Sequence, residues 1–371
     1  MVTASPPVLP LIDRYGRPLT NLRVMVTGKC NFKCFFCHME GYTESAGVQE
    51  ITVEEMGLVA EALTKIGVSS FKITGGEPTL RTDLVDLIAA IRRHNPRAYI
   101  SMTTNASLLK RHLQGLVEQR IGHINVSMHS LREEVFYRIT GTRLYSNVIE
   151  SVLAAHDYGI PLKINVVVLR GLNDVEIEGF VEFAARVNAK LQFIELHPVG
   201  KAKTISFDKY HIPWFEVLDK LKKRITKVRY RYSLHNRPIL MLDNGVEVEL
   251  VGPVGNPVFC SACTRVRLSY DLKLIPCLNW RREPIDVRGR IEGFKAREDK
   301  LEAIIKAFKE VVSLREPFYM AGLGQENAYV KRPWKTARLG LPKRGGGLSF
   351  TEPRALHHLL KYLEEWGYEP S

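Results

Sequence analysis

The sequence predicts an α/β fold in which a partial (β/α)6 barrel is followed by an α+β region. Short β-branched runs alternate with amphipathic helical patterns six times over the first 200 residues, as parallel βαβ units do. A closed barrel of this kind needs eight strands, so six strands predict a curved sheet that stays open. After about residue 199 the alternation stops and a hairpin signal appears, which predicts the α+β region.

The six predicted strands have the composition and length of strands in a buried parallel sheet. Each is a run of five to seven residues that is rich in β-branched and other apolar side chains. Because ligands of such sheets gather at the carboxyl ends of the strands, chemistry is expected directly after each run. The runs are residues 22–27, 70–74, 99–103, 123–128, 162–168 and 191–196.

The helices between these strands are marked by their start and stop signals. Thr52-Val-Glu-Glu55 is a capping box, and the helix that it opens is ended by Gly67. The next helical pattern stops before Asn95-Pro96, because proline cannot continue a helix. This second helix and the later ones are predicted at residues 82–93, 108–118, 131–139, 147–158 and 175–187.

The second half of the chain has a different pattern. A basic amphipathic helix is predicted over residues 214–224, and Asp243-Asn244-Gly245 is a strong turn signal between two strands. We therefore expect a barrel domain over residues 1–200, a second region over 201–320 and a basic extension over 321–371 without an assigned role. The remaining elements are predicted as strands 239–242 and 246–250, helices 301–312 and 352–366, and a flexible basic segment 322–347.

Composition limits the class of protein without choosing its function. The 371 residues contain no run of 18 or more apolar residues, so no membrane-spanning helix and no membrane partner are expected. The first residues lack the basic and apolar segments of a secretory signal, so a cytoplasmic location is expected. The net charge of +13 favours anionic partners, but composition alone is explained as well by a charged surface without a specific partner.

Cys30, Cys34 and Cys37 form the first of two cysteine clusters. They lie directly after the first predicted strand, with three and then two residues between them. One tight loop of this spacing can offer three thiolates to a four-iron cubane and leave its fourth iron without a protein ligand. The alternative is a zinc site, which needs a fourth ligand, and the adjacent His38 is an awkward one.

The second cluster uses the other three cysteines, Cys260, Cys263 and Cys277. Three thiolates again fall one short of a closed four-ligand site, so a second open cluster is predicted. Zinc remains an alternative here, with His235 as the evident fourth ligand. Between these cysteines, alternation puts two arginines on one side of an extended segment, where they suit a phosphorylated substrate or form a solvated basic strand. These arginines are Arg265 and Arg267.

The first cysteine motif resembles that of the radical S-adenosylmethionine (SAM) superfamily. The segment Thr74-Gly75-Gly76-Glu77-Pro78 ends the second predicted strand, where that superfamily has its Gly-Gly-Glu motif. The resemblance implies a radical SAM barrel whose site-differentiated [4Fe-4S] cluster binds SAM and cleaves it to a 5′-deoxyadenosyl radical. The residues that would contact SAM are Phe36, Gly75, Gly76, Glu77, Ser127 and His197.

The resemblance is narrowed to one family, the GTP 3′,8-cyclase family of molybdenum cofactor biosynthesis, by residues 259–278 and 13–23. The segment Cys37-His-Met-Glu-Gly41 is most similar to archaeal members of this family. The resemblance implies a lyase with two [4Fe-4S] clusters that removes hydrogen from the ribose 3′ carbon of GTP and joins this carbon to C8 of guanine. The second cluster would hold the guanine. The GTP-binding residues would be Arg23, Lys72, Thr103, Lys163, Arg265 and Arg267.

The chain departs from the family pattern at several positions. Gln192 and Lys72 stand where arginine is common, and His197 stands where methionine is common. Gln192 removes one expected cation from the triphosphate site. Bacterial members end in two glycines that are thought to enter the active site, whereas this chain has an internal run, Gly345–Gly347, that is either a counterpart or a linker.

Two other functions remain open at this point. One is a radical SAM enzyme that modifies a peptide or RNA through a similar auxiliary cluster. The other is a non-catalytic metal protein that binds nucleic acid through its positive charge, although the Gly-Gly-Glu motif would then be unexplained. For a cyclase, the implied partners are GTP, an electron donor and a downstream cyclic pyranopterin monophosphate synthase. A homodimer is possible within the family, and no nucleic-acid partner is expected.

Overall fold

The structure, a computed structural model, describes residues 9–316 except 43–46, 204, 206 and 255. The predictions for residues 321–371, including Gly345–Gly347, lie outside the described residues. The strands in chain order are β1 (Asn21–Met25), β2 (Ser70–Thr74), β3 (Tyr99–Thr104), β4 (His123–Ser127), β5 (Leu162–Val168), β6 (Lys190–Glu195), β7 (Ile225–Arg231), β8 (Arg237–Leu242), β9 (Glu247–Val251), β10 (Arg265–Leu268), β11 (Lys273–Ile275) and β12 (Ile285–Asp286).

Helices follow the first six strands as predicted. The α-helices are α1 (Val53–Lys65), α2 (Leu84–His94), α3 (Leu113–Glu118), α4 (Glu133–Thr140), α5 (Tyr145–Asp157), α6 (Ile177–Arg186), α7 (Phe207–Tyr210), α8 (Trp214–Leu221), α9 (Pro257–Ser261), α10 (Val287–Ile291) and α11 (Arg297–Ser313). The 3-10 helices are η1 (Met39–Gly41), η2 (Pro78–Leu80), η3 (Leu109–Arg111), η4 (Gly200–Lys203) and η5 (Lys222–Arg224).

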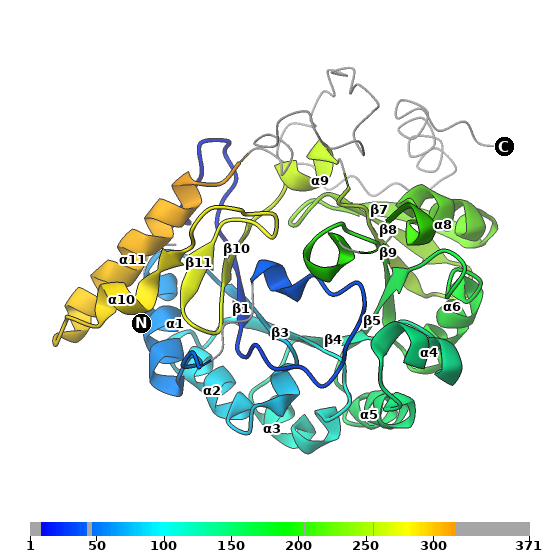
Figure 1. Ribbon diagram of the computed structural model, residues 1–371, viewed down its shortest axis with the longest axis horizontal. Coiled ribbons are helices and arrows are strands. Elements are labelled where there is room, and N and C mark those ends of the chain that lie inside the picture. Colours follow the sequence, from blue (N-terminus) through cyan, green and yellow to red (C-terminus); the bar gives the residue numbers. More distant parts are fainter. Residues whose placement is uncertain (1–8, 43–46, 204, 206, 255, 317–371) are drawn as a thin grey trace, which may run out of the picture.

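Strands β1 to β12 belong to one curved, open sheet, which confirms the predicted fold class. Their order is β12-β11-β10-β1-β2-β3-β4-β5-β6-β9-β8-β7, and β1 to β6 pair in parallel. Helices α1 to α6 and α8 cover its outer surface (Figure 1). The sheet ends at β12 and β7, and the connection that contains α9 crosses from one side of this opening to the other (Figure 1).

The sheet extends beyond the six predicted strands on both sides. β10 pairs in parallel with β1, and β9 pairs in parallel with β6, so the second half of the chain adds strands to the barrel wall. The predicted division at residue 200 stays a prediction. The sequence did not reveal β7, because its half-buried positions mix basic and apolar side chains along an edge strand.

Local signals explain where the elements begin and end. The predicted capping box is present at α1, where the Glu55 N–H donates to Thr52 Oγ1 at 3.1 Å and the Thr52 N–H donates to the Glu55 carboxylate at 2.9 Å. The helix predicted over 108–118 is instead divided into η3 and α3. The break falls at His112, whose Nε2 contacts the Thr79 carbonyl oxygen at 3.0 Å.

Alternation along each strand separates an apolar outer face from a polar inner face. On β1, Leu22 and Val24 are fully buried beneath the helices, whereas Asn21 and Arg23 face the inside of the barrel. The core therefore lies between the sheet and its helices, and the concave side is left for a ligand. Within the described residues, no helix has the length and apolar character needed to cross a membrane.

Candidate active site

One cavity of about 450 Å³ occupies the concave side of the sheet. Its wall includes inward residues of β1 to β6, the loop after β1, and segments next to β8, α9 and β11. All six cysteines contribute to this wall, and none of them forms a disulfide. Among the described residues that line the cavity, nine are lysine or arginine and three are glutamate. The cavity therefore favours an anionic ligand.

The first cysteine loop is held across the mouth of the barrel by the Gly-Gly-Glu turn. The Gly76 N–H donates to the Thr27 carbonyl at 2.7 Å, and the Glu77 N–H donates to the Lys29 carbonyl at 2.7 Å. A Cβ at position 76 would lie 2.1 Å from the Lys29 oxygen, so only glycine permits this approach. The loop is seen in front of the centre of the barrel in Figure 1.

The thiols of this loop suit a metal centre. The Phe32 N–H donates to Cys30 Sγ and the Met39 N–H donates to Cys37 Sγ, each at 3.4 Å. Burial raises the pKa of Cys30 to about 11 and also raises that of Cys34, so these thiolates need the charge of a bound metal. As they stand, the described His, Cys, Asp and Glu side chains include no group of three that could hold a metal ion. Three observations support an iron–sulfur cluster at this loop: the spacing of Cys30, Cys34 and Cys37, their position in the wall of one cavity, and the backbone N–H groups that donate to two of the sulfurs.

Glu77 braces the base of the same loop. Its carboxylate accepts from the Thr79 N–H at 3.0 Å, the Thr104 hydroxyl at 2.5 Å and the Asn105 N–H at 2.6 Å. Burial raises its pKa despite these hydrogen bonds. Glu77 thus ties the end of β2 to the end of β3, and its predicted contact with SAM stays a prediction.

The second cysteine cluster is supported by arginines from both ends of the described chain. Arg17 Nη1 donates to the Cys260 carbonyl at 3.1 Å, and Arg315 Nη2 donates to the Cys263 carbonyl. Burial alone would raise the pKa of Cys263, but Arg315 and the nearby Arg265 hold it below the ordinary value. This electropositive setting stabilises a thiolate and fits a metal ligand.

Asn279 links the second cluster to the end of β6. Its Nδ2 lies 3.9 Å from Cys277 Sγ, and its Oδ1 lies 3.1 Å from His197 Nε2. His235, the candidate fourth zinc ligand, stacks on Phe259 with ring centroids 4.1 Å apart and contacts Arg237 through Nδ1 at 2.8 Å. The Nδ1 of His235 is therefore engaged by a guanidinium.

Two buried glutamates organise the cations of the barrel. Glu40 forms ion pairs with Arg23 and Arg267 and accepts from Thr74 Oγ1 at 3.0 Å. Glu249 pairs with Lys163 at 2.5 Å, with Arg231 at 3.2 Å and with Arg237 at 3.3 Å. Burial would raise the pKa of each carboxyl, but these cations hold both pKa values well below the usual range.

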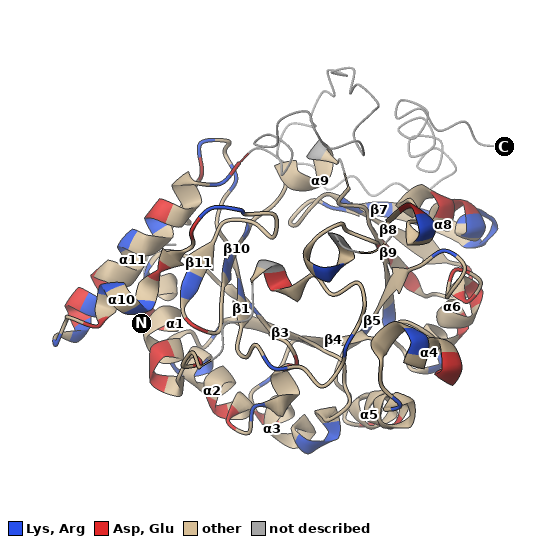
Figure 2. Ribbon diagram, in the orientation of Figure 1, with Lys and Arg blue, Asp and Glu red and all other residues tan. Residues whose placement is uncertain are grey.

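The cations between these two glutamates are poorly neutralised. Burial, followed by the charges of Arg23 and Arg265, pushes the pKa of Lys72 well below its ordinary value. Within the described residues, Arg23 Nε, Arg237 Nε and Asn165 Oδ1 are buried without a hydrogen-bond partner. Figure 2 shows basic positions on β10 and β5 inside the barrel, whereas the outer helices carry both signs of charge. A bound polyanion would supply counter-charge to these cations and hydrogen-bond acceptors to their unpaired donors.

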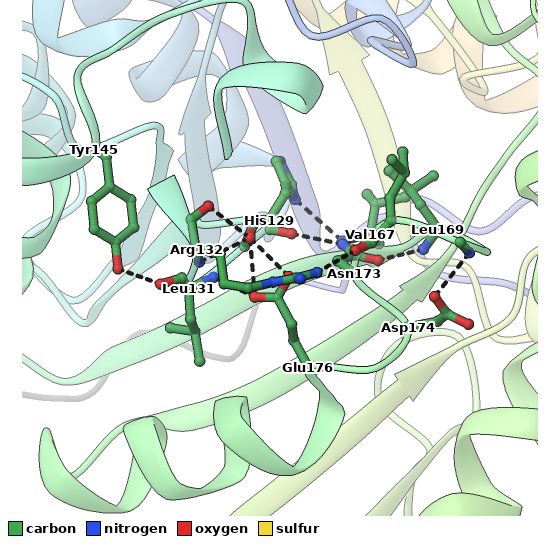
Figure 3. A network of polar contacts seen from close by, with 12 residues as sticks. His129, Leu131, Arg132, Tyr145, Val167, Leu169, Asn173, Asp174 and Glu176 are labelled. Carbon is green, nitrogen blue, oxygen red and sulfur yellow. Dashed lines mark hydrogen bonds and ion pairs between the residues drawn. The ribbon is translucent and has the colours of Figure 1, made fainter. Parts of the chain in front are cut away.

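A separate polar network fixes the loops after β4 and β5 (Figure 3). Asn173 Nδ2 donates to the carbonyls of His129 at 2.6 Å and Val167 at 2.8 Å. The Glu176 carboxylate accepts from the Leu131 N–H at 2.7 Å. Burial lowers the pKa of His129 to about 4, and its edge packs against Phe36 of the first cysteine loop. The network therefore supports the wall on which Phe36 and Ser127 lie.

Two family models together match most of the chain. The model of the radical SAM superfamily matches residues 24–184, and the model of Molybdenum Cofactor Synthesis C matches residues 189–320. A protein of Aeropyrum pernix named "Probable GTP 3′,8-cyclase" is 37% identical, over 92% of this chain and 94% of its own. A protein of the same name from Thermococcus kodakarensis is 39% identical, over 83% and 99%.

The chain belongs to the GTP 3′,8-cyclase family of radical SAM enzymes. The predicted recognition is thereby confirmed. Among solved structures, Streptococcus suis SuiB bound to the precursor peptide SuiA has a TM-score of 0.57 and 17% identity. The aligned part covers 73% of this chain and 64% of that one, less than two thirds of its length, and this likeness shows the fold alone.

For this member of the GTP 3′,8-cyclase family, the structure brings every predicted site residue to one cavity. Their individual contacts with clusters, SAM or GTP stay predictions. The residues concerned are Cys30, Cys34, Cys37, Cys260, Cys263, Cys277, Phe36, Gly75, Gly76, Glu77, Ser127, His197, Arg23, Lys72, Thr103, Lys163, Arg265 and Arg267.

Sequence reasoning missed Glu40, Arg237 and Asn279 of this radical SAM site. A signal existed for Arg237, because alternation in the predicted strand 239–242 extends back to position 237 and puts it on the same face. No local pattern distinguishes Glu40 or Asn279. Their contacts join segments far apart in the sequence, such as Glu40 and Arg267.

Proposed function

We propose that the chain converts GTP to 3′,8-cyclo-7,8-dihydro-GTP, the first step of molybdenum cofactor biosynthesis. One observation carries this proposal: the two cysteine triplets and a wall of lysines and arginines line the same cavity. A substrate held there could meet both a radical source and a second metal centre. Membership of the GTP 3′,8-cyclase family supports GTP as that substrate.

The donor sets support two clusters and SAM as cofactors. Cys30, Cys34 and Cys37 would hold a [4Fe-4S] cluster that, with SAM, supplies the 5′-deoxyadenosyl radical. Residues 260, 263 and 277 would hold a second [4Fe-4S] cluster and leave one iron for the guanine. A zinc ion at the second site is the alternative, and iron analysis of the purified protein distinguishes the two.

The chain's own residues would bind and orient the substrate. Arg23, Arg265 and Arg267 on neighbouring strands would bind triphosphate oxygens, together with Lys72 and Lys163. The ribose would lose one hydrogen atom from C3′, and this carbon would then form a bond to C8 of guanine. One electron and one proton, added to the resulting guanine radical, would complete a product that is an isomer of GTP. The buried wall would exclude water that could quench a radical.

The proposed reaction requires partners that are not part of this chain. A low-potential electron donor is needed, and a cyclic pyranopterin monophosphate synthase would take the product. We place the reaction in the cytoplasm, where cysteine thiols remain reduced. A homodimer remains part of the proposal, and no nucleic-acid partner is included.

The decisive experiment is anaerobic reconstitution with iron and sulfide, followed by incubation with SAM, dithionite and GTP. Mass spectrometry should find 5′-deoxyadenosine and a new isomer of GTP, both absent when ATP replaces GTP and in the Cys34→Ser variant. 5′-Deoxyadenosine with GTP unchanged would instead favour a peptide or RNA substrate. Assembled clusters without any 5′-deoxyadenosine would favour the non-catalytic nucleic-acid-binding alternative.

A further inference from the structure

The carboxylate of Glu40 lies between two arginines that are neighbours in the sheet. Arg23 on β1 and Arg267 on β10 are directly paired in the strand register. Glu40 Oε1 accepts from Arg23 Nη2, and Oε2 accepts from Arg267 Nη1. The Thr74 hydroxyl also donates to Oε1, at 3.0 Å. Both oxygens of one carboxylate are therefore used to join two guanidinium groups.

The backbone that brings Glu40 to this place is strained. Met39 has φ of 50° and Glu40 has φ of 53°, both in the left-handed region that residues with a Cβ disfavour. The Glu40 N–H donates to Nδ1 of His38 at 3.0 Å, which helps to hold this turn. A strained turn persists only where surrounding contacts impose it, and here they include those of the Glu40 carboxylate.

The same carboxylate is buried and charged. Its side chain is 5% exposed, and those of Arg23 and Arg267 are 14% and 11% exposed. Two guanidinium groups this close repel each other in a dry site unless an anion lies between them. Arg23 keeps one buried donor, Nε, without a partner among the described residues, so the pair is not saturated by Glu40.

We propose that Glu40 is a positioning residue that holds Arg23 and Arg267 together as a pair and competes with the substrate's phosphate oxygens for their N–H groups. The inference rests on the proposed function only for the identity of the anion, a nucleoside triphosphate. A carboxylate and a phosphate present oxygens of similar spacing to arginine, so both fit the same donors. A polyphosphate that reaches the pair displaces Glu40 or binds against its charge.

This competition predicts an unusual effect of Glu40→Gln. The amide keeps the size of the side chain but removes the charge, so the pair should bind inorganic triphosphate about tenfold more tightly. Glu40→Asp keeps the charge and should bind it no more tightly than the wild-type protein. Glu310→Gln removes an equal charge at an exposed ion pair with Arg290 and controls for net charge.

The test is isothermal titration calorimetry of the anaerobically reconstituted holoenzyme with inorganic triphosphate, which measures binding without turnover. Tighter binding by the Glu40→Gln variant alone supports the proposal, and weaker or unchanged binding overturns it. Arg23→Gln should abolish the gain in the double variant. A gain that persists there also overturns the proposal, because the arginine pair would not be the anion site.

Thermal unfolding of the same proteins guards against a folding defect. Glu40→Gln should lower the midpoint temperature without ligand, because the arginines lose their counter-charge, and should enlarge the upward shift that triphosphate causes. A lower midpoint with no enlarged shift contradicts the proposal. If the anion results hold but no cyclised GTP is found, the proposed function fails while the role of Glu40 stands.

Discussion

At the scale of single residues, Gly76 shows how closely the backbone of the site is packed. Its α-carbon carries hydrogen where any other residue would place a Cβ 2.1 Å from the Lys29 carbonyl oxygen. This contact joins the Gly-Gly-Glu turn to the first cysteine loop through adjacent hydrogen bonds. The position of the three thiols therefore depends on the absence of a side chain at residue 76.

We expect Gly76→Ala to displace the first cysteine loop and to reduce the iron content of the reconstituted protein by about half, because this loop would hold one of the two proposed clusters. Iron and sulfide analysis with the visible absorption spectrum measures this loss. Gly293→Ala is the matched control, since its Cβ would meet no atom within 4 Å. Full iron content in the Gly76→Ala variant would contradict the argument.

Glu249 shows the energetic consequence of burying a carboxylate among cations. Replacing it with glutamine leaves Lys163, Arg231 and Arg237 without their shared counter-charge, which should cost about 3 kcal/mol of unfolding free energy. Burial opposes ionisation, yet Arg237 and the other cations hold the Glu249 pKa well below its usual range. The stabilisation is thus fully present above the unfolded pKa of about 4.3 and is lost as pH falls through the folded pKa.

The wild-type protein and the Glu249→Gln variant should therefore differ by a constant amount between pH 8 and pH 5, and the difference should shrink below about pH 4. Thermal unfolding followed by circular dichroism measures it, with Glu310→Gln as a control for an exposed pair. A difference that stays constant as the pH falls from 5 to 3 would mean that the pKa of Glu249 is not depressed.

At the scale of elements, the loops after β4 and β5 are joined by buried side chains rather than by backbone pairing. Asn173 alone bonds His129, Val167 and Leu169, and it is 1% exposed (Figure 3). Because His129 packs against Phe36, the same network also supports the first cysteine loop. The position of each of these two loops therefore depends on side chains of the other.

Asn173→Ala should lower the free energy of unfolding by about 3 kcal/mol, since it leaves two buried carbonyls and one N–H without partners. It should also weaken SAM binding, because the wall behind Phe36 loses its support. Chemical denaturation and SAM titration measure the two effects. The neighbouring Asp174→Ala removes one exposed contact, to the Gly171 N–H, and should change stability by less than about 0.5 kcal/mol.

The elements of the barrel were largely predictable from the sequence, and the reason is their periodicity. β5 was predicted with its observed bounds, and the capping box set the start of α1. The sequence patterns did not reveal β7 and did not show that β10 lies beside β1. Edge strands have weak patterns, and pairing between distant segments leaves no local signal.

Most residues of the candidate site were also predictable from the sequence, because they lie in spaced motifs or directly after predicted strands. Cysteine spacing and the ends of predicted strands pointed to residues that the structure gathers in one cavity. The counter-charges Glu40 and Glu249 were missed, because a glutamate on a loop and one on a predicted hairpin look like solvated residues. Only the fold shows that each is buried among cations.

At the scale of the whole molecule, positive charge is concentrated inside the barrel as well as spread over the surface. Nine lysines and arginines line the cavity among the described residues, against three glutamates, in a chain of net charge +13. A low-dielectric cavity whose lining charges are mostly of one sign focuses the electrostatic field and speeds capture of an ion of the opposite sign. The excess charge would therefore have a kinetic role in addition to its proposed role in binding.

We expect kcat/KM for GTP to fall about tenfold between 50 and 500 mM potassium chloride, because salt screens this field. The affinity for SAM, which has a much smaller net charge, should change by less than about twofold. Initial rates of 5′-deoxyadenosine formation over this range measure the first effect, and SAM titrations measure the second. Equal salt dependence for both ligands would argue against steering by the cavity.

The pairing of β10 with β1 has a consequence for biosynthesis. Asn21 and Arg265, which bond to each other across this pair, are 244 residues apart in the chain. The edge of β1 that pairs with β10 therefore stays unpaired while the ribosome makes nearly the whole barrel, because β10 is synthesised last of the two. Until then the nascent chain exposes an unpaired strand edge that precedes Cys30, Cys34 and Cys37, and such an edge is prone to pair with other chains.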